Sequence, residues 1–190
     1  METKSPLRSA SRSTSPVNGR GKITERARSL SSPACGGGGE AERSSAETEG
    51  GAARIVSLAR SWIGTPYVHQ ASLKGAGCDC LGLLRGVWRE LHGEEPEIAP
   101  PYSPDWAEAH GAETLRDALS RHFEEVALAE IVPGDVVLFR MAPRAPAKHC
   151  AIVGERDGAL TLIHARQNKR VSEEAFTLFW RRRLACVFRI

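Results

Sequence analysis

The chain contains cysteines, whose thiols can act as nucleophiles, and Cys80 has the sequence surroundings best suited to covalent catalysis. Cys80 follows a glycine-containing loop and stands at the predicted start of a helix, two residues after Cys78. The free N–H groups and dipole of a helix N-terminus stabilise a thiolate, the nucleophilic form of cysteine. Gly82 leaves room for the backbone of a substrate, and the N–H of Cys80 suits an oxyanion hole. We therefore predict that Cys80 is a nucleophile, whereas Cys78 stays in the loop.

Two histidines could serve this thiol as a base. His149 begins one predicted strand and His164 ends the next, so their rings can lie side by side on neighbouring strands. One imidazole would take the thiol proton while the other fixes its tautomer. Taken singly, each residue is more often an ordinary buried or hydrogen-bonded side chain, so the prediction depends on the combination.

The other histidines and cysteines are expected to have ordinary surroundings. We expect solvated histidines, most of them in loops or at helix ends, and inert packing thiols on strands. The histidines are His69, His92, His110 and His122, and the thiols are Cys150 and Cys186.

The elements that must position the candidate site follow from hydrophobic periodicity. Apolar residues spaced by three and four predict helices over 52–62, 80–91 and 112–122. Short apolar runs and an Asp-Gly turn signal predict strands over 135–140, 149–154, 159–164 and 184–190. Four prolines make 94–105 an irregular surface crossing. Helices followed by a mostly antiparallel sheet predict an α+β fold.

Composition sets the limits of the folded part. The chain has 190 residues, 41% of them hydrophobic, five cysteines and a net charge of +3. Residues 1–50 have ten serines and no aromatic residue, so we predict a disordered tail, or a start assigned too far upstream, before a domain over 52–190. No apolar run is long enough for a membrane span or a signal peptide, which predicts synthesis in the cytoplasm. The weak positive charge gives no reason to expect a nucleic-acid partner.

Several motifs in one order resemble a known family. They are Gly64-Thr65-Pro66-Tyr67, Gly77-Cys78-Asp79-Cys80-Leu81-Gly82, Pro133-Gly134-Asp135, His149-Cys150-Ala151 and Ile163-His164-Ala165. This order resembles the NlpC-type, papain-like cell-wall cysteine peptidases over about residues 54–190. The segments 67–72, 101–106 and 180–183 resemble the subgroup encoded in phage-like tail clusters and gene transfer agents.

The resemblance assigns a role to five residues. It implies that Cys80 is the nucleophile, His149 the general base and His164 the residue that orients the base. It further implies that Tyr67 and Asp79 lie near the reacting carbonyl and help to bind it. Leu81 stands where the family usually has Ser, a departure expected to alter the rim of the site.

The resemblance also implies a function. The expected enzyme is a papain-like thiol endopeptidase that needs no metal or organic cofactor and cleaves peptidoglycan stem peptides, at the bond between γ-D-glutamate and diaminopimelate. It would be carried in a phage-like particle, with tail proteins as partners, and would open the cell wall.

Three alternatives stay open from the sequence alone. A papain-like site could act as an amidase or acyltransferase on another amide, or the chain could be a non-catalytic tail component. A structural zinc module is the third, with Cys78, Cys80, His149 and Cys150 as ligands. Adjacent His149 and Cys150 point to opposite faces of a strand, which disfavours one shared ion.

Overall fold

The structure is a computed structural model that describes residues 39–102 and 111–190, with side chains from residue 50 onward. Four helices and one 3₁₀ turn are described: α1 (Gly39–Arg60), α2 (Cys80–His92), α4 (Thr114–Ser120), η1 (Leu128–Glu130) and α5 (Leu178–Arg181). The described strands are β1 (Ser72–Leu73), β2 (Gly77–Cys78), β3 (Glu124–Val126), β4 (Val136–Phe139), β5 (His149–Arg156), β6 (Ala159–His164), β7 (Ser172–Ala175) and β8 (Leu184–Arg189).

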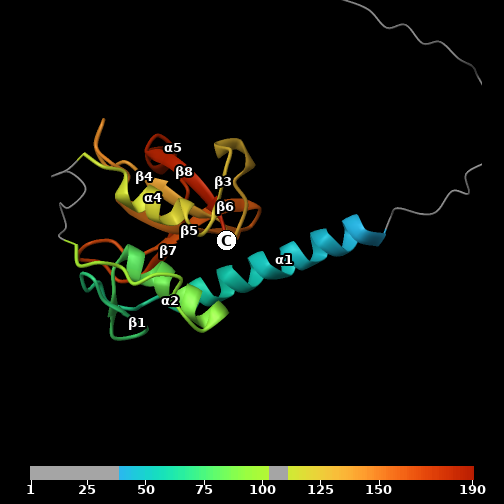
Figure 1. Cartoon of the computed structure of the whole chain (residues 1–190), viewed down its shortest axis with the longest axis horizontal. Coiled ribbons are helices and arrows are strands. Elements are labelled where there is room, and N and C mark those ends of the chain that lie inside the picture. The colour runs from blue at the N-terminus through green and yellow to red at the C-terminus, as the bar shows by residue number, and fades with distance from the viewer. Residues whose placement is uncertain (1–38, 103–110) are drawn as a thin grey trace, which may run out of the picture. The chain divides into compact units, whose positions relative to one another are not determined.

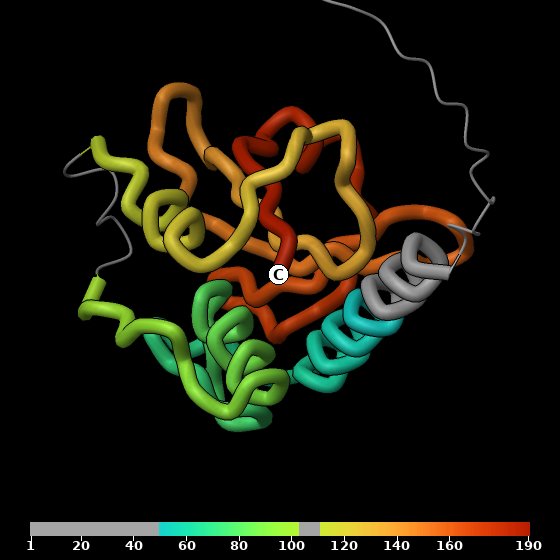
Figure 2. The backbone as a smooth tube through the Cα atoms, turned by 45° about the vertical axis from the view of Figure 1, so that its right-hand side comes forward, coloured from blue at the N-terminus to red at the C-terminus, as the bar shows by residue number. Residues whose placement is uncertain are grey.

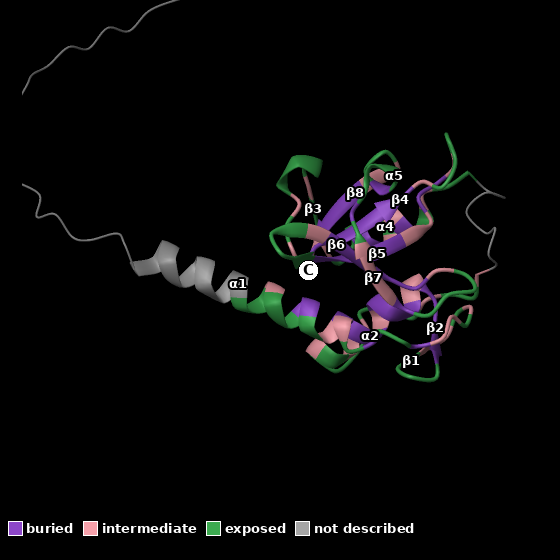
Figure 3. Cartoon of the chain, turned by 180° about the vertical axis from the view of Figure 1, so that it is seen from behind, coloured by how far each residue is buried: buried purple, intermediate pink, exposed green. Residues whose placement is uncertain are grey.

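The strands from β3 to β8 form one sheet. Their order is β3-β8-β4-β5-β6-β7, and every pairing within it is antiparallel. All four residues of β4 are buried, because this strand lies inside the sheet and is covered on both faces (Figure 3). The chain therefore has the predicted α+β fold, with N-terminal helices packed on an antiparallel sheet (Figure 1).

Two hydrophobic clusters lie on opposite faces of this sheet. Alternate residues of β4 divide between them, with Val136 and Leu138 on one face and Val137 and Phe139 on the other. Helices α1, α2 and α4 pack on the first face (Figure 2). On the second face, α5 contributes the buried side chain of Trp180. The candidate site is built where the start of α2 meets the start of β5.

Helix α2 is held at both ends by local chemistry. The carboxylate of its N-cap, Asp79, accepts a hydrogen bond from the backbone N–H of Gly82. Gly93 ends the helix with a φ of 88°, a conformation that favours glycine. Gly86 faces the Trp62 ring of the segment after α1, where a Cβ atom would lie 2.1 Å from a ring carbon. This close approach fixes α2 against the end of α1, a contact that the sequence did not predict, although each segment has the predicted buried face.

The predicted hairpin between β5 and β6, with its Asp-Gly turn, is confirmed. Asp157 and Gly158 both have positive φ, 53° and 74°, which suits the two central positions of a type I′ turn. Arg156 pairs with Ala159 directly across it. The turn fixes the register of the two strands that carry His149 and His164.

The predicted boundaries differ from the structure in places. α1 begins at Gly39, well before the predicted start at Ala52, because a segment without large apolar residues gives no periodic signal although its Glu and Ala residues favour helix. The short elements β1, β2, β3, β7 and α5 were not predicted. Residues 39–50 of the predicted disordered tail belong to α1, which differs from the prediction, while residues 1–38 of the tail lie outside the described residues, as do residues 103–105 of the predicted crossing. No helix among the described residues is long and apolar enough to span a membrane.

Candidate active site

The thiol of Cys80 lines a surface cavity of about 250 Å³. The cavity brings together all the predicted site residues except His164, which is fully buried. Its lining residues are Tyr67, His69, Asp79, Cys80, Tyr102, Met141, Lys148, His149, Ala165, Arg166, Gln167 and Trp180. Cys80 itself is only partly buried. The residue is therefore open to the cavity.

Cys80 is the first residue of α2, as predicted. A hydrogen bond from the thiol of Cys150 is the largest of the effects that hold the pKa of Cys80 well below its ordinary value. Burial acts in the opposite direction, but the positive charge of His149, a hydrogen bond from its ring and the backbone N–H of Cys150 favour the thiolate. The side chain of Cys80 is thus prepared to act as a nucleophile.

The neighbouring thiols have the opposite tendency. Burial, followed by the nearby carboxylate of Asp79, raises the pKa of Cys78 to about 12. Burial raises the pKa of Cys186 to about 11. The hydrogen bond to Cys80 raises the pKa of Cys150 well above its ordinary value, since Cys150 must keep its proton to donate. Among the described cysteines, only Cys80 has a lowered pKa.

The prediction for Cys150 is wrong. The sequence predicts an inert packing thiol at this position, whereas the structure places its side chain beside the candidate nucleophile. The strand pattern contained a signal, because Cys150 follows His149 and points to the face on which α2 packs. Cys186 is buried in the core, as predicted.

The two candidate histidines meet as the sequence predicts. Nε2 of His149 lies 2.9 Å from Nδ1 of His164. In the β5–β6 register Ile152 pairs with Ile163, which puts His149 diagonally across from His164 on the same face of the sheet. Because Nε2 of His149 is engaged in this way, Nδ1 is the nitrogen left for Cys80.

His164 is fully buried, unlike His149. Burial lowers the pKa of His164 to about 3, and the positive charge of His149 and of Arg166 acts in the same direction. His164 therefore stays neutral through the physiological pH range. A neutral ring can orient His149 without competing with it for the proton of the thiol.

Tyr67 lies in the cavity with Cys80, as the resemblance implies. Its position is fixed by a parallel bridge between its backbone and that of Cys78. Burial, followed by the negative charges of Asp79 and Cys80, raises the pKa of Tyr67, so its hydroxyl keeps its proton. The hydroxyl is a hydrogen-bond donor of the kind that a developing oxyanion needs.

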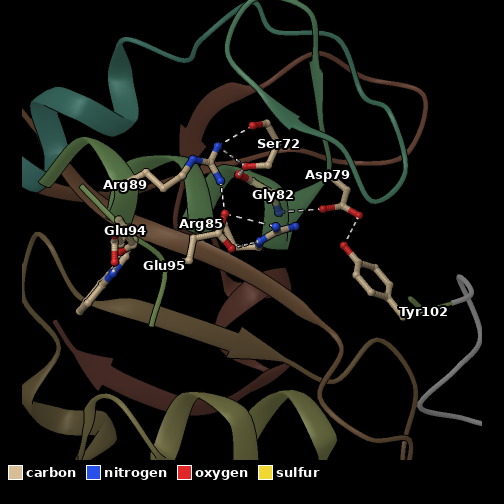
Figure 4. A network of polar contacts seen from close by, with 9 residues as sticks. Ser72, Asp79, Gly82, Arg85, Arg89, Glu94, Glu95 and Tyr102 are labelled. Atoms are coloured by element: carbon tan, nitrogen blue, oxygen red, sulfur yellow. Dashed lines mark hydrogen bonds and ion pairs between the residues drawn. The ribbon is translucent and has the colours of Figure 1, made fainter. Parts of the chain in front are cut away.

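Asp79 is engaged mainly by the protein itself. Besides capping α2, it accepts a hydrogen bond of 2.7 Å from the backbone N–H of Gln70. It also accepts a hydrogen bond of 2.6 Å from the hydroxyl of Tyr102 (Figure 4). Nδ1 of His69 lies 3.5 Å from the same carboxylate. These contacts fix the loop before Cys80 and indicate a structural role. A direct contact of Asp79 with substrate stays a prediction.

Arginines on the outer side of α2 support the same region. Arg85 and Arg89 both pair with the carboxylate of Glu95, and Arg89 also donates to the backbone oxygen and hydroxyl of Ser72 (Figure 4). Ser72 in turn donates to the carbonyl of Gly82. The network ties the β1 hairpin to the first turns of α2 and so limits the movement of Cys80.

The geometry does not support the zinc alternative. Within residues 39–102 and 111–190, no three His, Cys, Asp or Glu side chains are arranged to share a metal ion. Cys78 is fully buried, and burial with the charge of Asp79 disfavours the thiolate that zinc would need.

Alkylation should distinguish Cys80 from the other cysteines. At about pH 6, iodoacetamide is expected to modify Cys80 faster than Cys78, Cys150 and Cys186, because a lowered pKa preserves the thiolate below the usual range of about 8.5. Raised pKa values leave the other three thiols protonated at this pH.

Mass-spectrometric peptide mapping over a pH series would measure each rate, and it separates Cys35, which lies outside the described residues. If Cys80 became reactive only at the same high pH as Cys186, the lowered pKa would be contradicted.

The sheet order, the helix start with its cysteine and the paired histidines define a papain-like fold of the NlpC/p60 kind. No family model matches the chain. The NlpC/p60 domain of the peptidoglycan hydrolase SagA has a TM-score of 0.50 and 24% identity, over 73% of this chain and 98% of that one. An NlpC/p60 family protein from Bacillus cereus has a TM-score of 0.52 and 20% identity, over 73% of this chain and 39% of that one.

A curated protein is also similar in sequence. It is the gamma-DL-glutamyl hydrolase of Bacillus subtilis (strain 168), which is 31% identical over 118 residues. The match covers 62% of this chain and 24% of that protein, so the chain spans about a quarter of the length of this relative. A structure of the peptidoglycan hydrolase RipB from Mycobacterium tuberculosis has a TM-score of 0.50 and 19% identity, over 82% of this chain and 73% of that one.

Proposed function

We propose that the chain is a cysteine peptidase that hydrolyses the stem peptides of peptidoglycan. The observation that carries the proposal is the cavity that Cys80 and His149 line together, with Nδ1 of the buried His164 2.9 Å from Nε2 of His149. The relatives support the choice of substrate, since two solved neighbours are named peptidoglycan hydrolases and the curated relative is named a gamma-DL-glutamyl hydrolase.

The proposed reaction follows from the positions of the atoms. Sγ of Cys80 attacks the scissile carbonyl carbon and forms a tetrahedral oxyanion, which the Tyr67 hydroxyl and the N–H of Cys80 stabilise. The proton on Nδ1 of His149 passes to the departing amine, leaving an acyl-enzyme. His149 then takes a proton from water, which attacks the thioester and restores the thiolate.

The proposed bond is the one between γ-D-glutamate and diaminopimelate. The test is digestion of purified peptidoglycan that contains diaminopimelate, with mass spectrometry of the fragments. Peptides that begin with diaminopimelate are expected in the supernatant, while L-Ala-D-Glu stays on the glycan. Release of the whole stem peptide would instead show an amidase, and transfer of the acyl group to an added amine would show an acyltransferase.

The setting in a phage-like tail is a further part of the proposal. It is supported by the sequence resemblance of segments 67–72 and 180–183, while residues 103–106 of the third segment lie outside the described residues. Co-purification of the chain with tail particles, and its loss from tail-less particles, would test this setting and the inferred route from cytoplasm to cell wall.

A further inference from the structure

The carboxylate of Glu174 contacts His164, the buried member of the candidate triad Cys80, His149 and His164. No sequence motif includes Glu174. Glu174 lies on β7, the strand next to β6. Its Oε1 atom lies 3.1 Å from Nε2 of His164 and accepts a hydrogen bond of 2.8 Å from the indole N–H of Trp180. Its Oε2 atom lies 3.5 Å from a guanidinium nitrogen of Arg166. Glu174 therefore extends the chain from Cys80 through both histidines.

The direction of the hydrogen bonds in this chain follows from what each group can do. A carboxylate oxygen only accepts, so Nε2 of His164 must carry a proton when it bonds to Glu174. Since His164 is neutral, its Nδ1 then has a lone pair and accepts the proton on Nε2 of His149. Neutral His149 is left with a lone pair on Nδ1. This is the state that can take the proton of Cys80.

Without the carboxylate, the two histidines could be arranged in the reverse direction. A neutral His164 could carry its proton on Nδ1 and donate it to Nε2 of His149. His149 would then be protonated on Nδ1 while still neutral, and could not act as a base toward the thiol. Fixing the wrong tautomer in a triad costs about 10⁴-fold in rate in the serine protease case.

Trp180 holds Glu174 and His149 in place together. Its ring stacks on the ring of His149, with centroids 5.5 Å apart and planes 26° apart. The indole N–H of Trp180 can only donate, so it holds the acceptor oxygen Oε1 of Glu174 beside it. The same oxygen faces Nε2 of His164.

We propose that Glu174 is a positioning residue of this site: it fixes His164 in the Nε2-protonated tautomer and thereby leaves Nδ1 of His149 available to Cys80. The inference rests on the proposed function, since it assigns a partner to the same triad. No proton passes to Glu174 in the reaction. The proton moves from Cys80 to His149 and on to the departing amine, while the bonds behind His149 keep their direction.

The charged groups around His164 come from several elements. His149 on β5, with Arg166 and Lys169 in the loop after β6, oppose a positive charge on His164. Glu174 on β7 supplies the negative charge nearest to its ring. Removal of Glu174 is thus expected to affect both the tautomer of His164 and the stability of a positive charge on His149.

The test compares three variants of the full chain, with Cys80→Ala as the inactive reference. Glu174→Ala removes the acceptor, and Glu174→Gln keeps an oxygen that the Trp180 N–H can hold in place. Glu173→Gln is the matched control, because the neighbouring carboxylate pairs with Arg60 and Arg156 instead of the triad.

We expect Glu174→Ala to lower kcat by about 10- to 100-fold, as is usual for groups that orient a catalytic or ligating histidine, with KM little changed. The pH at which Cys80 becomes reactive to iodoacetamide should move upward in this variant. Glu174→Gln should restore most of kcat and of the alkylation profile, and Glu173→Gln should match the wild type in both.

Several results would overturn the inference. Unchanged kcat and alkylation in Glu174→Ala, while Cys80→Ala is inactive, would refute it and leave the proposed function intact. Full activity of Cys80→Ala would refute the proposed function instead. Should Glu174→Ala fail to fold, ¹⁵N NMR of the histidine rings in the wild type decides: a proton on Nε2 of His164 supports the inference, and a proton on Nδ1 overturns it.

Discussion

Replacement of Cys80 by Ala is expected to lower kcat/KM on peptidoglycan by about 10⁴-fold or more, because among the described residues no other thiol lines the cavity. Cys80→Ser should be nearly as inactive, since the surroundings that favour a thiolate do not suffice to ionise a hydroxyl. Neither change enlarges a side chain, so both proteins should keep the circular dichroism spectrum and melting temperature of the wild type within a few degrees. Release of diaminopimelate-containing peptides measures the activity.

Cys78→Ala is the matched control for Cys80→Ala. Cys78 stands two residues earlier and is fully buried, so its truncation leaves a small cavity and costs stability of about 1 kcal/mol. Its kcat/KM should nevertheless stay close to that of the wild type. Equal activity in Cys80→Ala and the wild type would remove the proposed mechanism, and inactivity of Cys78→Ala in a folded protein would undermine the assignment of the nucleophile.

Replacement of His149 by Ala is expected to lower kcat by about 10³-fold, within the range that a general acid–base group contributes. Two effects combine. The departing amine loses its proton donor, and Cys80 loses the charge and the hydrogen bond with which His149 lowers the pKa of the thiol. The hydrogen bond from Cys150 still lowers the pKa of Cys80 in this variant. The pH at which Cys80 reacts with iodoacetamide should therefore move only part of the way toward that of an ordinary thiol.

The pH dependence of wild-type activity is a second test of this mechanism. In the wild type, activity should persist as the pH falls below the ordinary range of a thiol, and His164 should add no transition between about pH 5 and 8, because its lowered pKa is about 3. The exposed His92→Ala is the control, since this residue lies at the far end of α2. Wild-type kcat in His149→Ala would contradict its role as the base.

The sequence predicted those parts of the site that local physics determines. Cys80 at a helix start and His164 at the end of a strand follow from patterns of a few residues, and the Asp-Gly turn fixes the register that joins the two histidines. The strong periodicity of 80–91 also predicted α2 to within one residue.

The parts that were missed depend on distant contacts. Glu174 and Trp180 meet His164 only because β7 and α5 pack beside β6, and neither element has a periodic signal of its own in the sequence. Cys150 was assigned to packing because a buried thiol on a strand is usually inert, and its contact with Cys80 arises from the docking of α2.

The adjacency of His149 and Cys150 on β5 links catalysis to strand pairing. In the proposed mechanism two consecutive residues serve the sulfur atom of Cys80, the imidazole as base and the thiol as hydrogen-bond donor, although their side chains alternate between the two faces of the sheet. Sliding this strand by a single position would exchange the two groups and abolish the proposed activity, even in a chain that remained compact. Turnover is therefore a sensitive measure of whether a refolded molecule has assembled its strands in the correct alignment.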